Sequence, residues 1–320
     1  MPQNLTGRSF LTLKDYAPEE IRYLLDLSKE YKRLKRVGIF PKKLQNKNVA
    51  LIFEKPSTRT RCAFTVACFD EGAHPEYLGK NDIQMGKKES IADTARVLGR
   101  MFDGIQYRGF DQKIVEDLAK YSGVPVWNGL TDDDHPTQVL ADFLTIEENQ
   151  GEVKGKKLVY CGDGRNNVAN ALLIGAMKMG MHFTIAAPGT LFPKKELQDW
   201  AGQIAKDTGA VLELEKDPHK AVKNADAIYT DVWVSMGEDG KPGIQERIES
   251  LRPYQVNAKL MAATGKKNTV FLHCLPAHHQ DGVHNMEVTE DVFESQNSRV
   301  FDEAENRLHT IKAVMVATLT

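Results

Sequence analysis

The sequence predicts an α/β protein of two doubly wound domains, each a parallel sheet flanked by helices. Three observations support this prediction. Short apolar runs alternate with helical patterns, which is typical of parallel sheets covered by helices on both faces. A polar segment over 149–155 divides this alternation into two parts. The length of 320 residues is more than one hydrophobic core usually covers.

The individual elements follow from the spacing of apolar residues. These residues recur on one helical face over 18–36, which predicts an opening amphipathic helix. Short apolar runs predict strands at 49–53, 104–107, 124–127, 157–161, 183–187, 211–214, 227–230 and 270–273. Helical patterns lie near 90–102, 112–121, 136–148, 166–179, 194–207 and 245–263. The closing stretch, 301–319, predicts a helix that returns to the first domain.

The polar segment 149–155 is the predicted boundary between the domains. The first domain is therefore expected to comprise 1–148 together with the closing helix, 303–320, and the second domain 149–302. We see no internal repeat and no low-complexity tract.

Composition excludes several classes of protein. A formal net charge of -2 gives no basic surface for nucleic acid. No apolar stretch approaches the roughly 20 residues that cross a bilayer, and the first residues lack the apolar core of a signal peptide. Four cysteines form no CxxC pair, so we expect reduced thiols in a cytoplasmic protein.

The segment 57–61, Ser-Thr-Arg-Thr-Arg, follows a predicted strand and opens a helical pattern. The first turn of a helix has unpaired N–H groups and partial positive charge, so it attracts phosphate, and arginine adds a charged fork. Positions i and i+2 lie about 200° apart on a helix. We therefore assign Arg59 to a phosphate and Arg61 to a structural ion pair. An ordinary Ser/Thr cap with solvated arginines is the alternative.

Further polar groups follow other predicted strands, where open α/β sheets bind ligands. An imidazole and an amide at the start of a helix, His135 and Gln138, suit a carbonyl oxygen and an NH₂ group, although capping explains them too. Six such clusters predict a cleft between two sheets. The others are Arg108, Asn166-Asn167, Asp231 with 235–237, and 273–276.

Other interpretations of these clusters are possible. The turn 161–167 bears glycines, but it lacks the third glycine of a dinucleotide site, and Asn167 is as suited to capping as to a carboxylate. Cys274 lies near three histidines, yet the spacing matches no familiar zinc pattern. The same cysteine is also a candidate nucleophile or a small buried residue. Asp231 suits a substrate ammonium group or a turn.

Taken together, the motifs resemble the aspartate/ornithine transcarbamoylase family, most closely its ornithine branch. The resemblance runs from about Leu11 to Thr320. It is carried by FEKPSTRTR at 53–61, HPTQ at 135–138, DVWVSMGE at 231–238, HCLP at 273–276 and ENRLHTIKA at 305–313. The Ser-Met-Gly and His-Cys-Leu-Pro motifs are specific to the ornithine branch. Lys87 stands where many relatives have His, and 277–288 is shorter than in many bacterial members.

The resemblance implies that carbamoyl phosphate gives its carbamoyl group to the side-chain amine of ornithine, with citrulline and phosphate as products and the reverse direction possible. It implies no cofactor and no metal, and a homotrimer or a multiple of trimers. The implied carbamoyl phosphate site comprises Ser57, Thr58, Arg59, Thr60, Gln84 from a neighbouring subunit, Arg108, His135, Gln138, Cys274, the Leu275 backbone and Arg307. The implied ornithine ligands are Asn167, Asp231, Ser235 and Met236.

The implied chemistry is direct transfer without a covalent intermediate. Arg108 and His135 would stabilise charge on the carbonyl oxygen, while Asp231 and Cys274 would position the amine. Alternatives remain at this point. The acceptor could be putrescine or another amine, and the chain could be a non-catalytic anion-binding module or a dehydrogenase.

Overall fold

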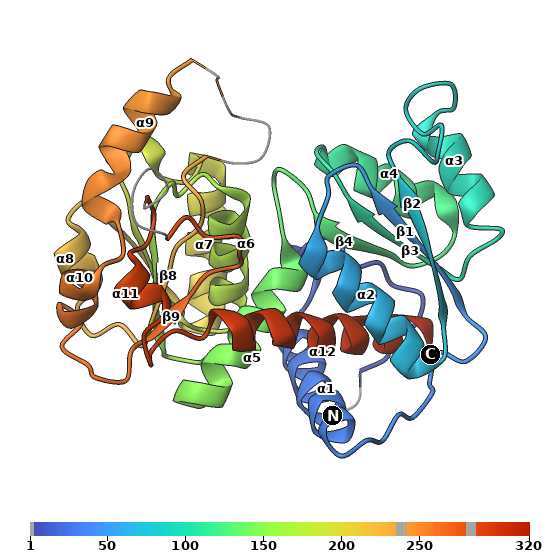
Figure 1. The fold of residues 1–320 in the computed structure, drawn as a ribbon, viewed down its shortest axis with the longest axis horizontal. Coiled ribbons are helices and arrows are strands. Elements are labelled where there is room, and N and C mark those ends of the chain that lie inside the picture. The colour runs from blue at the N-terminus through green and yellow to red at the C-terminus, as the bar shows by residue number, and fades with distance from the viewer. Residues whose placement is uncertain (1–2, 235–239, 241, 280–285) are drawn as a thin grey trace. The chain divides into compact units, whose positions relative to one another are not determined.

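The computed structural model describes residues 3–234, 240, 242–279 and 286–320. The chain divides into two compact units (Figure 1). Unit 1 comprises Met1–Leu144 with Glu305–Thr320, and unit 2 comprises Thr145–Ala304. The predicted fold class is confirmed, because each unit is built on a parallel sheet flanked by helices and the end of the chain returns to unit 1.

Unit 1 contains a four-stranded sheet in the order β2-β1-β3-β4, with every neighbouring pair parallel. Strand β2 was not predicted from the sequence. It carries a proline at its second position and is only partly buried, so it lacks the apolar run of an inner strand. The elements are α1 Pro18–Arg36, β1 Asn48–Phe53, α2 Thr58–Glu71, β2 His74–Gly79, α3 Ile91–Leu98, β3 Gly104–Arg108, α4 Gln112–Ser122 and β4 Val126–Leu130, after a 3-10 turn at Leu13–Asp15.

Unit 2 contains a five-stranded parallel sheet in the order β7-β6-β5-β8-β9. The elements are β5 Lys157–Cys161, α6 Asn167–Lys178, β6 His182–Ala186, a 3-10 turn at Gly189–Leu191, α7 Lys195–Thr208, β7 Val211–Glu215, α8 Pro218–Ala221, β8 Ala227–Tyr229, α9 Ile244–Leu251, a 3-10 turn at Arg252–Tyr254, α10 Ala258–Ala262, β9 Val270–Leu272 and α11 Glu290–Phe293. Helices α5 Pro136–Gln150 and α12 Val300–Leu319 contribute residues to both units.

The single helix predicted over 245–263 is wrong. The structure has α9, a 3-10 turn and α10 in its place. Pro253 lies in that turn, where it has no N–H to donate and disfavours a helical conformation at the preceding residue.

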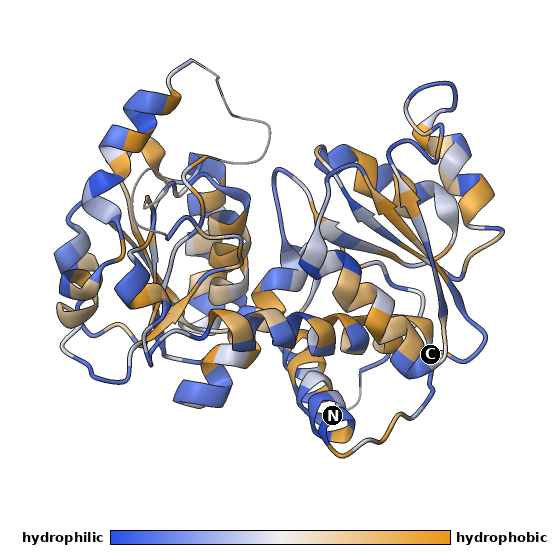
Figure 2. Ribbon diagram, viewed as in Figure 1, coloured by the Kyte–Doolittle hydropathy of each residue, from blue (hydrophilic) through white to orange (hydrophobic). Residues whose placement is uncertain are grey.

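Alternation along the strands sorts the side chains of unit 1 between the two faces of its sheet. Ala50, Ile52 and Tyr107 belong to a core cluster with residues of α3 and α4. On the opposite face Trp127 packs against Phe64 of α2, with ring centroids 6.1 Å apart. Apolar residues, orange in Figure 2, are concentrated on the strands, on α6 and on the later part of α12.

The topology fixes where a ligand site is expected. Strand order reverses between β1 and β3 in unit 1 and between β5 and β8 in unit 2. In open parallel sheets, ligands bind beyond the carboxyl ends of the strands at such a switch point. Ser57 and Arg108 stand at the first switch point, and Asn166 and Asp231 at the second.

No helix in the described ranges combines the length and apolar character needed to cross a membrane. Most strands are buried along nearly their whole length, which is why they read as continuous apolar runs in the sequence.

The end of α12 is tied to the sheet of unit 1 through Trp127. The indole is fully buried, and its Nε1–H donates to Thr318 Oγ1 at 3.0 Å. Gly104 makes room for the ring, because a Cβ there would lie 2.3 Å from it.

We predict that Thr318→Val lowers the free energy of unfolding by about 1–3 kcal/mol, because it leaves the buried indole N–H without an acceptor while keeping the shape of the side chain. Urea unfolding followed by tryptophan fluorescence measures the change. Thr320→Val is the matched control. Thr320 is exposed, and its hydroxyl also donates to a backbone carbonyl of α12, that of Val316. Equal stability of Thr318→Val and wild type would show that this hydrogen bond does not hold α12.

Candidate functional site

The start of α2 forms the first part of the site. Ser57 is extended and caps the helix, with its Oγ accepting from Thr60 N at 3.2 Å. Thr58 is the first helical residue, so backbone N–H groups of this turn and the partial positive charge of the helix face the end of β1. Ser57 therefore caps the helix, as the alternative interpretation predicted. The remaining N–H groups of this turn are still able to bind an anion.

Two buried guanidinium groups share the hydroxyl of Thr60. Arg307 Nη2 donates to Thr60 Oγ1 at 3.0 Å, and Arg108 Nη1 donates to the same oxygen at 3.4 Å. Arg307 comes from α12 and Arg108 ends β3, so the returning helix and the sheet place them together. Only 2% of Arg307 and 7% of Arg108 is exposed. Positive charge is thus concentrated beside the first turn of α2.

Gln138 joins this cluster from the first turns of α5. Its Oε1 accepts from Arg307 Nη1 at 2.7 Å, and its Nε2 donates to Asp142 Oδ1 at 2.8 Å. An ionised carboxylate only accepts hydrogen bonds, so Asp142 fixes which end of the Gln138 amide faces Arg307. Asp142 was not singled out from the sequence, although its position four residues after Gln138 places it on the same helix face.

His135 precedes α5 and is 3% exposed. Burial lowers the pKa of His135 well below its usual value, and the charges of Arg307, Arg108 and Arg59 lower it further. The imidazole is therefore neutral near pH 7. Its Nδ1 is buried and has no hydrogen-bond partner among the described residues. A neutral ring beside cationic groups can donate one N–H to a ligand oxygen without adding charge.

Three other residues of unit 1 that were singled out from the sequence make no hydrogen bond to Thr60 among the described residues. Arg59 is half-buried on α2, and its charge helps to lower the pKa of His135. Arg61 is exposed, and the predicted ion pair is wrong within the described part of the chain: its guanidinium lies over the Tyr77 ring, 3.8 Å from the centroid. Gln84 is exposed on the loop between β2 and α3, and among the described residues no hydrogen bond joins its side chain to the cluster around Thr60.

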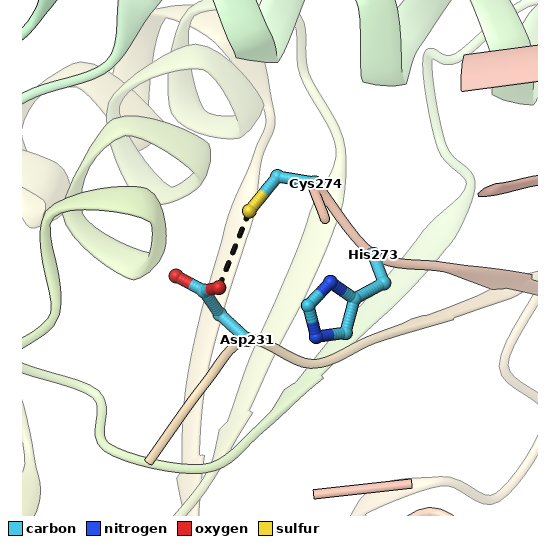
Figure 3. A group of neighbouring side chains, drawn as sticks. All are labelled: Asp231, His273 and Cys274. Carbon is cyan, nitrogen blue, oxygen red and sulfur yellow. Dashed lines mark hydrogen bonds between the residues drawn. The ribbon is translucent and has the colours of Figure 1, made fainter. Parts of the chain in front are cut away.

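Unit 2 holds a second cluster around Asp231, at the end of β8 (Figure 3). Cys274 Sγ donates to Asp231 Oδ1 at 3.2 Å, and Asn166 Nδ2 donates to Asp231 Oδ2 at 3.0 Å. Asp231 is 6% exposed, and the backbone N–H of Val232 also donates to Oδ1, at 2.8 Å. A carboxylate held through both oxygens is a fixed negative charge suited to an ammonium group.

Of the predicted pair Asn166-Asn167, it is Asn166, and not the predicted ligand Asn167, whose side chain contacts Asp231. Its Oδ1 caps α6 by accepting from Val168 N at 2.6 Å, while its Nδ2 reaches Asp231. Asn167 is the first helical residue and is half-buried. The pair of asparagines signalled a cap, but sequence alone does not show which of them precedes the first helical residue. Ser235 and Met236 lie outside the described residues.

The backbone after Cys274 is held by a buried histidine. Leu275 has a left-handed backbone, with φ 60°, and its N–H donates to His273 Nδ1 at 2.9 Å. That bond places the His273 proton on Nε2, which lies 3.3 Å from Glu287 Oε1, and both side chains are fully buried. Glu287 follows a segment with no local pattern, so no sequence signal pointed to it.

The donor atoms of Asp231, His273 and Cys274 all lie within 4.8 Å of one another (Figure 3). The thiol and the carboxylate share a hydrogen bond, so Cys274 and Asp231 orient each other.

The chain is similar to known proteins along nearly its whole length. The family described as aspartate/ornithine carbamoyltransferase matches twice, through its carbamoyl-P binding domain over 8–148 and its Asp/Orn binding domain over 154–318. A Bacillus licheniformis protein named ornithine carbamoyltransferase, catabolic, is 60% identical and covers 99% of this chain and 97% of its own. A Streptococcus pyogenes ornithine carbamoyltransferase is 56% identical, covering 100% of this chain and 98% of its own.

Solved structures agree. Ornithine carbamoyltransferase from Pyrococcus furiosus superposes with a TM-score of 0.93 at 48% identity, covering 99% of this chain and 98% of its own. An anabolic ornithine carbamoyltransferase from Campylobacter jejuni superposes with a TM-score of 0.87 at 37% identity, covering 96% and 97%.

The carboxyl group of Asp134, next to His135, generates a prediction about pH. Burial raises the pKa of Asp134 to about 7, against smaller opposing effects of a Thr12 hydrogen bond and the His135 backbone. The unfolded chain releases this proton near pH 3.9. Between these values the folded state binds more protons, so this group makes the protein less stable as pH rises from about 4 to about 7.

We therefore predict that Asp134→Asn is more stable than wild type at about pH 8, and that this advantage shrinks toward zero near pH 4. Urea unfolding over this pH range measures it. Asp133→Asn removes an exposed neighbouring carboxylate and should show no such trend. If the stability advantage of Asp134→Asn grew on acidification, the pKa of Asp134 would be lowered by folding and not raised.

Proposed function

The chain belongs to the aspartate/ornithine carbamoyltransferase family, and on that premise we propose how its side chains bind and activate the two substrates. The enzyme transfers the carbamoyl group of carbamoyl phosphate to the side-chain amine of ornithine, giving citrulline and phosphate. The residue roles that follow are our proposal.

Carbamoyl phosphate binds to unit 1, with its phosphate at the first turn of α2. Ser57, Thr58, Arg59 and Thr60 hold the phosphate. The observation that carries this assignment is the Thr60 hydroxyl, which stands in that turn and is shared by two buried guanidinium groups. A phosphate dianion matches both the helix terminus and the arginine forks.

The carbamoyl group binds beside the phosphate. Arg108 and the neutral His135 donate to the carbonyl oxygen, where negative charge grows as the amine attacks. Gln138, turned by Asp142, presents its amide oxygen toward the carbamoyl NH₂, with Arg307 holding the same oxygen. Cys274 and the Leu275 backbone complete the carbamoyl phosphate site. Leu275 needs its unusual backbone to do so, and the His273 hydrogen bond supports that backbone.

Ornithine binds to unit 2. Asp231 takes the α-ammonium group, because its carboxylate is buried and fixed by Cys274 and Asn166. Asn167 takes the carboxylate, and Ser235 and Met236 complete the predicted ornithine site. Cys274 lies near the attacking nitrogen and helps to position it.

The side-chain amine of ornithine must be neutral to attack, although a free amine of this kind has a pKa near 10. Attack at the carbamoyl carbon forms the new C–N bond, and the C–O bond to phosphate breaks. The electron pair leaves with the phosphate, which Arg59 and the helix terminus receive. The proton that the amine loses as the C–N bond forms passes to the departing phosphate. No covalent enzyme intermediate is required, so the rate gain comes from proximity and electrostatics.

Three further properties are proposed. Relatives whose names include the word catabolic support the direction that starts from citrulline and phosphate and yields ornithine and carbamoyl phosphate. We also propose a homotrimer, or a multiple of trimers, in which Gln84 completes the site of a neighbouring subunit. Its exposed side chain on a loop supports this. The four free cysteines support a cytoplasmic location.

The phosphate assignment predicts different outcomes for two arginines on one helix. Arg59→Ala should lower kcat/KM by a factor on the order of 10²–10³ or more, because it removes charge where the leaving phosphate develops it. Arg61→Ala, the matched control, should keep most of the activity and lose about 0.5–1 kcal/mol of stability through the Tyr77 contact. Citrulline assays and thermal melts separate the two. Exchanged outcomes would refute the helical-face argument.

The shared site predicts complementation between inactive proteins. A mixture of Arg59→Ala and Gln84→Ala subunits should regain activity. Hybrid trimers contain some sites in which neither substitution is present, because the native Arg59 of one subunit meets the native Gln84 of its neighbour. The citrulline assay follows recovery, and native mass spectrometry follows subunit exchange. Confirmed exchange without any recovered activity would contradict a site completed by Gln84.

A further inference from the structure

A third group of chemically active side chains lies in unit 2, apart from the Asp231 cluster. It comprises His279, Glu290 and Glu294, whose donor atoms all lie within 4.8 Å of one another. Glu290 begins α11 and Glu294 caps its end, while His279 lies on the segment that follows Cys274. We propose that these three side chains bind a divalent transition-metal ion of the Zn²⁺ class.

The donor set has the chemistry that such an ion prefers. Imidazole nitrogen and carboxylate oxygen are ordinary ligands of Zn²⁺, Co²⁺ and Ni²⁺. Zinc bonds to these atoms are about 2.0–2.2 Å long, so rotations of the half-buried Glu290 and the exposed Glu294 side chains would bring the donors onto one ion.

The imidazole is already held in place for this role. Its ring stacks on Phe293, with centroids 3.7 Å apart and planes 8° from parallel. Phe293 is 4% exposed, so the stacking partner is fixed in the core. The ring edge bearing Nδ1 contacts the Glu290 carboxylate through a hydrogen bond. A metal ion would bind here by replacing the proton that Nδ1 and the carboxylate share, because these ligands bind in their deprotonated forms.

A divalent ion would balance the negative charge of the two glutamates better than the histidine does. Glu290 and Glu294 are four residues apart on one helical turn, where like charges repel. A protonated His279 balances one carboxylate at most, whereas a divalent cation balances both. Within the described ranges Glu294 has no hydrogen-bonded or ion-paired side-chain partner. The exposure of Glu294 also leaves a path for the ion and room for water ligands.

Metal binding here would connect α11 to the segment after Cys274. The backbone of that segment is also fixed through His278, whose N–H donates to Glu287 Oε1 at 2.6 Å. The ion would add a cross-link between two parts of unit 2, and it would stabilise the folded state by binding only that state.

Cobalt distinguishes this site from the Asp231 cluster, because Co²⁺ bound to a thiolate absorbs strongly in the near ultraviolet and Co²⁺ bound to nitrogen and oxygen does not. Untagged protein is titrated with Co²⁺ and the visible bands are followed. Wild type should bind one ion without a thiolate band. Glu294→Gln should weaken that binding at least about tenfold. Asp291→Asn, which removes an exposed carboxylate from the same turn, should leave it unchanged.

Thermal melts with and without Zn²⁺ give a second readout in a Cys274→Ser background, which removes the thiol. The melting temperature should rise with Zn²⁺ in this background and with Asp291→Asn added, but not with Glu294→Gln added. The proposal is overturned if Glu294→Gln binds Co²⁺ as wild type does. It is also overturned if all bound Co²⁺ shows a thiolate band and disappears with Cys274→Ser.

Discussion

Unit 1 is organised around the burial of positive charge beside a single hydroxyl. The Arg108 and Arg307 guanidinium groups are almost wholly removed from water, and both reach Thr60. Burying charge is unfavourable unless the fold supplies hydrogen bonds or a counter-ion. Thr60, Thr137 and Gln138 supply oxygens, and a bound phosphate dianion would supply the opposite charge. This arrangement ties ligand affinity to the same residues that hold α12 against the sheet.

The parallel topology explains how distant residues meet at one place. Arg108 ends β3, and alternation along that strand directs it to the face covered by α2. Arg307 arrives from α12, which returns to this unit at the end of the chain. Unit 2 repeats the principle, since Asn166 follows β5 and Asp231 follows β8 at its switch point. Sheet order, rather than sequence proximity, thus assembles both clusters.

The sequence predicted the fold class and most inner strands, because buried parallel strands are continuous apolar runs. It missed β2, whose proline and polar residues suit an edge, and it joined α9 to α10 across Pro253. The chemistry-bearing motifs were found because they follow strands. The roles of Asn166 and Glu287 could not be predicted from the sequence. The role of Asn166 depends on the exact residue at which α6 begins, and Glu287 contacts the site only because the folded chain brings it there. The 235–239 portion of the ornithine motif lies outside the described residues.

The charged clusters of the two units differ in sign, and this difference suits the two proposed substrates. Burial, together with the charges of the nearby arginines, lowers the pKa of His135 and keeps its imidazole neutral, which suits its proposed role as a donor to a carbonyl oxygen. Asp231 offers a buried carboxylate in the other unit, already oriented by Cys274 and Asn166. Carbamoyl phosphate is anionic and ornithine carries ammonium groups, so the proposed sites would each attract one substrate and repel the other. The same fields then act on the reaction, because negative charge grows on the carbonyl oxygen and on phosphate, which the cationic unit is proposed to hold.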